Sequence, residues 1–174
     1  PHLAIIRVGE RPDDCSYERG ATKKMDKVGF DCTSYVFPQD ITDEEFQKEF
    51  DKINNDDNID GILLLRPLPK HINEKAIEER INPVKDLDGI SPVNLAKVYA
   101  GDVNGFAPCT AEAVIEMLDY AGIDLTGKRV TVVGRSLVIG KPVAMMLMKK
   151  NATVTVCHTK TKDMAGTCRN AEVL

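Results

Sequence analysis

The chain of 174 residues is 43% apolar and 29% charged, with 5% aromatic side chains and no Trp. This is the composition of a globular protein, and it excludes a disordered tail, a collagen-like repeat and a disulfide-stabilised miniprotein. The net charge of −4 argues against nucleic acid or an anionic membrane as the partner. No apolar run approaches the roughly 18–20 residues of a membrane span, and no signal peptide is visible.

The five cysteines contain no CxxC pair and the three histidines are scattered, so neither set has the spacing of a metal site. We therefore expect free thiols, a cytoplasmic protein and no bound metal. Because the sequence starts at Pro1 and stops within an apolar run at Leu174, we also expect it to be part of a longer protein.

Strands and helices alternate in the first half of the chain. Apolar, β-rich runs predict strands at Leu3–Val8, Cys32–Phe37 and 60–65, and helices are predicted at Cys15–Val28, after Thr42 and at Asn73–Arg80. Thr42 opens its helix with a capping box, and Phe46, Phe50 and Ile53 recur on one face of that helix. This β-α-β-α-β order implies parallel strands joined by right-handed crossovers, and therefore the α/β class.

The second half resumes this alternation after an interruption. Residues 81–109 are polar and contain three prolines, so we expect a functional loop or a connection between domains there. The predicted segments that follow are a helix capped by Thr110 and ended by Gly122, a strand at Arg129–Val133, a helix at Gly140–Lys150, a strand at Ala152–Cys157, a helix at Asp163–Asn170 and the start of a strand at Glu172. They predict the beginning of a second β-α-β-α-β unit.

A turn rich in small residues joins the strand Arg129–Val133 to the next helix. Gly134, Arg135 and Ser136 begin this turn and Gly140 ends it. The start of a helix offers backbone N–H groups and the positive end of the helix dipole to a phosphate. The segment lacks the GxGxxG fingerprint, because Ser136 occupies the second glycine position and the last glycine falls one residue late. A tight structural connection therefore remains the alternative, and Arg135 favours phosphate binding.

The strand after this turn indicates the cofactor. In dinucleotide-binding units, an acidic residue near the end of the second strand binds the ribose of NAD, whereas a basic residue suits NADP. Here that strand is followed by Thr159, Lys160 and Lys162, and residues 125–162 contain eight Lys or Arg and no acidic residue. This pattern favours NADP over NAD, with solvated surface charge as the alternative role of the two lysines.

Five motifs occur in the order and at the spacings of a known family. They are residues 61–71, Lys85-Asp86-Leu87-Asp88-Gly89, Pro108-Cys109-Thr110, residues 134–142 and residues 152–158. Over the whole chain they resemble the methylenetetrahydrofolate dehydrogenase/cyclohydrolase family. The resemblance implies an N-terminal α/β folate-binding domain, residues 1–109, followed by the first half of a Rossmann-type NAD(P)-binding domain, residues 110–174, with the active site between them.

Members of this family oxidise 5,10-methylenetetrahydrofolate to the 5,10-methenyl form by hydride transfer to NAD(P)+, and many then hydrolyse the product to 10-formyltetrahydrofolate. The resemblance implies two catalytic and substrate-binding residues, with Tyr17 stacking on the folate ring system and Asp88 binding the polar edge of the pterin. It also implies a cleft lined by Pro108, Cys109 and Thr110 and a cofactor site formed by Gly134, Arg135, Ser136, Gly140 and Thr159. Without the motifs, Tyr17 would be interpreted as a residue that packs against the protein and Asp88 as a residue of a turn.

The chain departs from the family pattern at two positions. Bifunctional members carry a lysine four residues after the tyrosine, essential for hydrolysis, and a glutamine before the Leu-Pro-Leu-Pro run. Here Ala21 and Leu65 occupy these positions. We therefore expect a dehydrogenase with weak or absent cyclohydrolase activity. The alternatives are a bifunctional enzyme in which Lys24 substitutes for the missing lysine, and a folate-binding relative without catalysis.

The expected ligands are tetrahydrofolate derivatives and NADP, with NAD as the alternative cofactor. By analogy with the family we also expect a homodimer.

Overall fold

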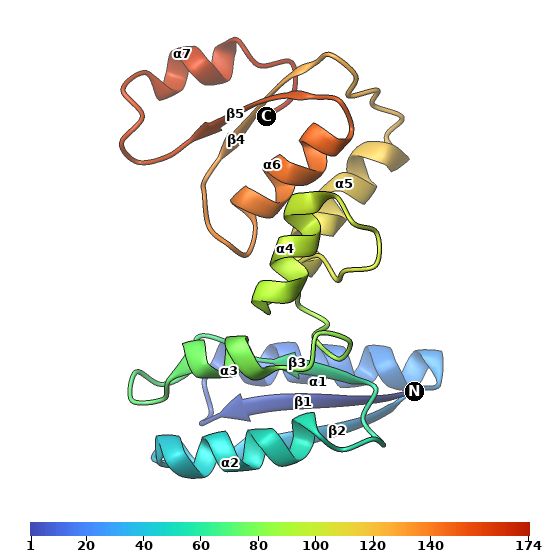
Figure 1. The fold of residues 1–174 in the computed structure, drawn as a ribbon, viewed down its shortest axis with the longest axis vertical. Helices are drawn as coiled ribbons and strands as arrows, with labels where there is room; N and C mark the ends of the chain where they lie inside the picture. The colour runs from blue at the N-terminus through green and yellow to red at the C-terminus, as the bar shows by residue number, and fades with distance from the viewer. The chain divides into compact units, whose positions relative to one another are not determined.

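The computed structural model describes all 174 residues, which divide into two compact units, Pro1–Pro92 and Val93–Leu174. The first unit contains β1 (His2–Val8), α1 (Pro12–Val28), β2 (Asp31–Phe37), α2 (Asp43–Asn54), β3 (Gly61–Leu64) and α3 (Glu74–Arg80), drawn in blue to green in Figure 1. The second contains α5 (Cys109–Tyr120), β4 (Arg129–Val133), α6 (Gly140–Lys149), β5 (Thr153–Cys157) and α7 (Met164–Arg169), and α4 (Pro92–Ala100) begins at the boundary. None of these helices is long and apolar enough to cross a membrane.

The three strands of the first unit form a parallel sheet in the order β2-β1-β3. Leu3 of β1 is level with Cys32 of β2 and with Gly61 of β3. Because β1 lies in the middle, the chain crosses to one side of it through α1 and returns to the other side through α2. Right-handed crossovers in opposite directions place these helices on opposite faces of the sheet. The predicted parallel α/β layer is confirmed.

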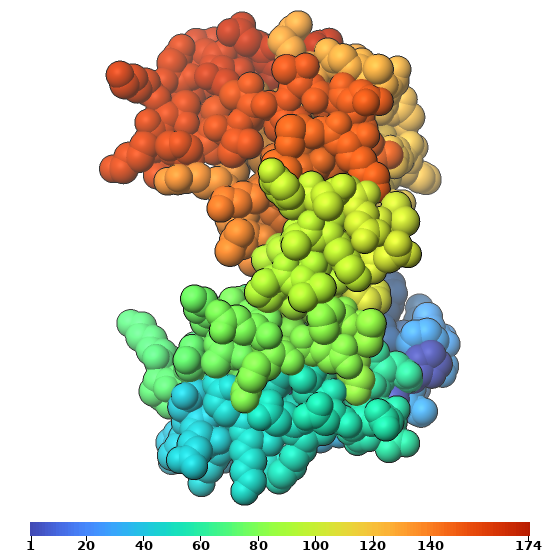
Figure 2. Space-filling model, viewed as in Figure 1, coloured from blue at the N-terminus to red at the C-terminus, as the bar shows by residue number.

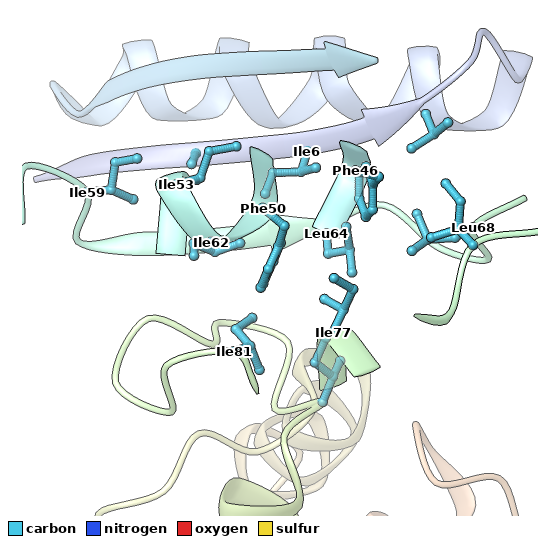
Figure 3. Packing of buried hydrophobic residues seen from close by; sticks show 14 residues of the cluster. Ile6, Phe46, Phe50, Ile53, Ile59, Ile62, Leu64, Leu68, Ile77 and Ile81 are labelled. Carbon is cyan, nitrogen blue, oxygen red and sulfur yellow. The ribbon is translucent and has the colours of Figure 1, made fainter. Parts of the chain in front are cut away.

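Each face of this sheet has its own apolar cluster. On the α1 face, Ala21 and Met25 pack against buried residues of β1 and β3 and against Leu65. The cluster on the opposite face includes Ile6, Phe46, Phe50, Ile62, Leu64 and Ile77, whose side chains lie close together in Figure 3. Burial of one such large apolar side chain stabilises the fold by about 1.5–3 kcal/mol, so these two clusters hold the helices against the sheet.

Helix α2 follows the pattern predicted for it. Thr42 accepts a hydrogen bond from the Glu45 amide at 3.2 Å, and the Glu45 carboxylate accepts one from the Thr42 amide, which completes the capping box. Phe46 and Phe50 are fully buried. The outer face of the helix, cyan in Figure 2, carries exposed charged residues. This amphipathic pattern orients α2 on the sheet.

The second unit is built around the parallel pair β4 and β5. Helices α5 and α6 pack with this pair in a cluster that contains Ile115, Val130 and Leu147. After α7 the chain returns to the other side of β4, where the Thr131 amide donates to the Val173 carbonyl at 3.0 Å. The strand predicted at Glu172 is therefore present as one parallel bridge, and β4 lies between β5 and this bridge.

Two predictions about local structure are wrong. Residues 81–109 are not one long loop, because they contain α4. Pro92 occupies the first helical position, where the missing N–H has no intrahelical partner, so proline there begins a helix rather than breaking one. Thr110 does not cap α5. The cap is Pro108, whose carbonyl accepts the Ala111 and Glu112 amides at 2.8 and 3.1 Å.

Candidate functional site

The predicted phosphate-binding turn joins β4 to α6 in a conformation that requires glycine at both ends. Gly134 has a φ of +127°, in a region of backbone conformation that residues with a Cβ atom rarely adopt. A Cβ atom on Gly140 would lie 2.3 Å from the Gly134 carbonyl oxygen and 2.8 Å from the Arg135 nitrogen. The two ends of the turn are therefore in direct backbone contact, which brings residues 134–140 into a compact loop over the start of α6.

Ser136 stabilises this loop from within. Its hydroxyl oxygen accepts the amides of Ile139 at 3.1 Å and Gly140 at 3.4 Å, and its carbonyl accepts the Lys141 amide at 3.0 Å. Ile139 is the N-cap residue of α6, and Gly140 and Lys141 are its first two residues, so Ser136 binds amides at the start of the helix. The sequence predicted Ser136 as a cofactor residue, and the comparison with GxGxxG did not predict these hydrogen bonds within the turn.

The exposed part of the turn provides donors for an anion. Residues Arg135–Val138 are exposed, and their amides donate no hydrogen bond to another residue of the protein. The positive end of the α6 dipole and the Arg135 guanidinium add favourable charge at the same place. Unused amides, a helix start and an arginine fit the phosphate groups of a dinucleotide.

The loop after β5 lies beside this turn. The Gly134 amide donates to the Cys157 carbonyl at 2.8 Å, which ties the carboxyl ends of β4 and β5 together. Thr159 is exposed in a turn that the His158 amide closes by donating to the Thr161 hydroxyl at 2.8 Å. The predicted residues Gly134, Arg135, Ser136, Gly140 and Thr159 are thus gathered at one edge of one sheet.

This edge is also where the strand order reverses, since the chain passes from β4 to β5 and then back to the far side of β4. In open α/β sheets, ligands bind beside the carboxyl ends of the strands at such a reversal.

In the first unit, Tyr17 lies in the second turn of α1 and is 58% exposed. A position at the surface is what stacking on a flat ligand requires. Lys24, two turns further along the same helix, is exposed. Because an α-helix rises 1.5 Å per residue, the Cα atom of Lys24 lies about 10 Å along the helix axis from that of Tyr17.

Ala21 and Leu65 belong to the apolar packing between α1 and the sheet. Leu65 is 8% exposed, and Ala21 packs against the cluster that contains it. The two positions at which the chain departs from the family pattern are therefore in one apolar cluster, and neither carries a polar group.

Asp88 is partly buried and lies in a turn in which the Gly89 amide donates to the Asp86 carbonyl at 3.3 Å. Asp86 forms a parallel bridge with Ile62 of β3, so the chain runs in the direction of β3 as it approaches Asp88. Pro108, Cys109 and Thr110 lie at the start of α5 in the second unit, with Cys109 and Thr110 exposed. The first unit carries Tyr17 and Asp88, and the second carries the remaining predicted site residues.

An ion pair beside Tyr17 was not predicted. Arg7 of β1 donates to the Glu18 carboxylate of α1, and both side chains are 13% exposed. Burial raises the pKa of Glu18, but the hydrogen bonds from Ser34 and Arg7 lower it. The net effect is a pKa below the ordinary value of this carboxyl. Glu18 is therefore held as a carboxylate between β1 and β2 and is unsuited to act as an acid.

The turn at the reversal of strand order defines the second unit as a dinucleotide-binding α/β domain. A sequence model of the tetrahydrofolate dehydrogenase/cyclohydrolase NAD(P)-binding domain matches residues 108–174, and a model of the catalytic domain of the same family matches residues 1–88. The chain belongs to the tetrahydrofolate dehydrogenase/cyclohydrolase family.

Individual relatives agree with this family. The chain is 51% identical to the bifunctional protein FolD of Clostridioides difficile over all 174 residues, which are 61% of that protein. It is similar to the solved structure of the bifunctional enzyme FolD from Campylobacter jejuni, with a TM-score of 0.94 and 38% identity over 98% of this chain and 60% of that one.

A methylenetetrahydrofolate dehydrogenase-cyclohydrolase from Trypanosoma brucei, solved with NADP and an inhibitor, has a TM-score of 0.92 and 37% identity over 98% of this chain and 59% of that one. The chain thus spans about three fifths of the length of the relatives it matches.

Proposed function

We propose that this protein oxidises 5,10-methylenetetrahydrofolate to 5,10-methenyltetrahydrofolate by hydride transfer to NADP+, with little or no cyclohydrolase activity. The observation that carries the proposal is the glycine turn of residues 134–140, which a folate-binding protein without catalysis would not need. The bifunctional FolD relatives support the class of reaction.

The residues of this chain would act mainly by binding and orientation. The amides of 135–138 would hold the pyrophosphate and the Arg135 side chain the 2′-phosphate, while Tyr17 and Asp88 would bind the ring system and polar edge of the folate. Pro108, Cys109 and Thr110, at the start of α5, would also bind the substrate. The bound cofactor supplies the hydride acceptor, and the protein aligns the donor carbon with it.

NADP is the cofactor that the charges favour. Arg135 and Thr159 lie at the joined carboxyl ends of β4 and β5, with Lys160 next to Thr159 and no acidic residue in the turn after β5. A carboxylate there would bind the ribose hydroxyl of NAD, whereas a guanidinium binds the 2′-phosphate of NADP. The Trypanosoma brucei relative solved with NADP supports this choice.

The direct test is folate-dependent reduction of NADP+ and of NAD+, followed by absorbance. In the variant Arg135→Ala we expect the KM for NADP+ to rise about 10- to 100-fold, because a hydrogen bond to a charged group contributes about 1.5–3 kcal/mol. The KM for NAD+ should change little. Arg129→Ala is the matched control, since Arg129 lies at the opposite end of β4 and binds Glu172. Equal losses with both cofactors would contradict the assignment of Arg135 to the 2′-phosphate.

The environment of position 21 supports the proposed loss of hydrolytic activity. An alanine packed in the cluster that contains Leu65 can neither transfer a proton nor polarise a hydroxyl. General acid–base help is typically worth about 10²–10⁴ in rate, so its loss reduces hydrolysis strongly while hydride transfer needs no side chain at this position.

Lys24 is the residue that would support the alternative, bifunctional function. It lies on nearly the same side of α1 as Tyr17, two turns away. The decay of methenyltetrahydrofolate with purified protein separates the two functions. Catalysed decay that Lys24→Ala abolishes and Lys23→Ala leaves unchanged would establish the bifunctional enzyme, and the absence of catalysed decay supports the monofunctional dehydrogenase.

We also propose a homodimer, by analogy with the family. Its test is the molecular mass of the protein in solution, and a monomeric mass at assay concentration would contradict it.

A further inference from the structure

The segment 85–91, which carries Asp88, is anchored to its unit at its first residues. The Lys85 ammonium donates to the carbonyl of Asn54, the last residue of α2, at 3.0 Å and to that of Asp56 at 2.7 Å. The Ile62 amide of β3 donates to the Lys85 carbonyl at 2.6 Å. The Leu87 side chain occupies the space beside Gly61, where an added Cβ would lie 2.6 Å from it. These contacts fix where the turn begins.

Asp86 holds the other end of the same turn. Its carboxylate is completely buried and accepts the Ile90 amide at 3.0 Å and the Ser91 amide at 2.8 Å, one with each oxygen. The Asp86 carbonyl accepts a hydrogen bond from the Gly89 amide, and Gly89 has a φ of +60°. One residue therefore binds three successive amides after Asp88.

A buried carboxylate is retained only where hydrogen bonds replace its hydration. The geometry of these bonds constrains the backbone on the C-terminal side of Asp88, as the anchoring contacts do on the N-terminal side. The turn can keep one conformation only while both sets of bonds are made.

We propose that Asp86 is a positioning residue, which fixes the turn 86–89 so that Asp88 is oriented to bind the pterin. This inference rests on the proposed function in so far as it takes tetrahydrofolate as the ligand. Asp86 itself is buried and acts through the backbone of its neighbours.

The test compares Asp86→Asn with wild type by two measurements on the full protein. An asparagine keeps one acceptor oxygen and turns an NH2 group toward the second amide, so one hydrogen bond is lost. We expect faster hydrogen exchange at the amides of Ile90 and Ser91, and a Kd for tetrahydrofolate, measured by calorimetry, about tenfold or more above that of wild type. The Kd for NADP+ should stay within about twofold. Asp88→Asn should weaken tetrahydrofolate binding without changing that exchange.

Asp43→Asn is the matched control. Asp43 also accepts a backbone amide, from Asn73 at 2.8 Å, but at the start of α2. We expect it to change neither the tetrahydrofolate Kd nor the exchange of residues 90 and 91. If Asp86→Asn does not fold, the same measurements are made on Asp86→Glu. That variant keeps the charge but displaces the carboxylate oxygens.

An Asp86 variant that binds tetrahydrofolate like wild type would overturn the positioning role. Loss of affinity for both ligands in parallel would do the same, because it would indicate general destabilisation. Wild type that binds tetrahydrofolate but reduces neither cofactor would contradict the proposed function and leave the comparison of binding constants intact.

Discussion

Among single residues, the two glycines of the turn 134–140 meet different structural requirements. Gly134 needs its positive φ, whereas Gly140 needs space, because its Cα faces the Gly134 carbonyl. Asp86 is a comparable case in the first unit. The motif in which it occurs drew attention to Asp88, and only the burial and hydrogen bonds of Asp86 identify it as the residue that holds the turn.

The space at Gly140 leads to a prediction. Gly140→Ala should cost about 1–3 kcal/mol of unfolding free energy, because the neighbouring atoms are backbone and cannot rotate away. It should also weaken NADP+ binding, since the turn must open to admit the methyl group. Thermal unfolding and calorimetric titration with NADP+ measure the two effects.

Gly20→Ala is the control for this prediction. Gly20 lies inside α1 with nothing within 4 Å of an added Cβ, so alanine should increase stability by about 0.5–1 kcal/mol. A Gly140→Ala variant with unchanged stability and unchanged NADP+ affinity would show that the contact of 2.3 Å is readily relieved.

At the scale of elements, periodic apolar patterns were the reliable signal. The strand Arg129–Val133 and the capped helix after Thr42 occur as predicted. Helix α4 was missed because Pro92 at its start is typical of a loop as well, and a proline at a helix start cannot be told from one in a loop without knowing its hydrogen bonds. Thr110 was assigned as a cap for a similar reason, since proline offers no side chain acceptor and is not a typical cap.

The Arg7–Glu18 pair joins α1 to β1 and predicts a pH dependence. Because the folded pKa of Glu18 lies below its ordinary value of 4.5, the stabilisation is complete above about pH 5 and decreases as the pH falls through the folded pKa. Glu18→Gln should therefore cost about 1–3 kcal/mol near pH 7. The difference from wild type should shrink in acid, as chemical denaturation at several pH values would measure.

Glu44→Gln removes the same charge from an exposed position on α2 and serves as the control. It should leave the unfolding free energy nearly unchanged across the same pH range. A Glu18→Gln effect that is constant between neutral and acid pH would contradict an ionised Glu18 in the folded protein.

At the scale of the whole molecule, the two units match different domains of the family. The matches to the catalytic domain at 1–88 and to the NAD(P)-binding domain at 108–174 leave α4 and its flanking residues between them. The basic stretch belongs to the second unit, so the small net charge of the chain hides an acidic first half and a basic turn region. The sequence predicted domains of residues 1–109 and 110–174, and this boundary stays a prediction.

The proposed enzyme is a dehydrogenase that stops at the methenyl product. Its most direct test is one assay with 5,10-methylenetetrahydrofolate and NADP+, in which NADPH and 5,10-methenyltetrahydrofolate are measured together over time. We predict that both accumulate in equal amounts, and that the methenyl form then decays no faster than in a control without protein. Failure to form NADPH, or its formation with protein-dependent loss of the methenyl product, would contradict the proposed function.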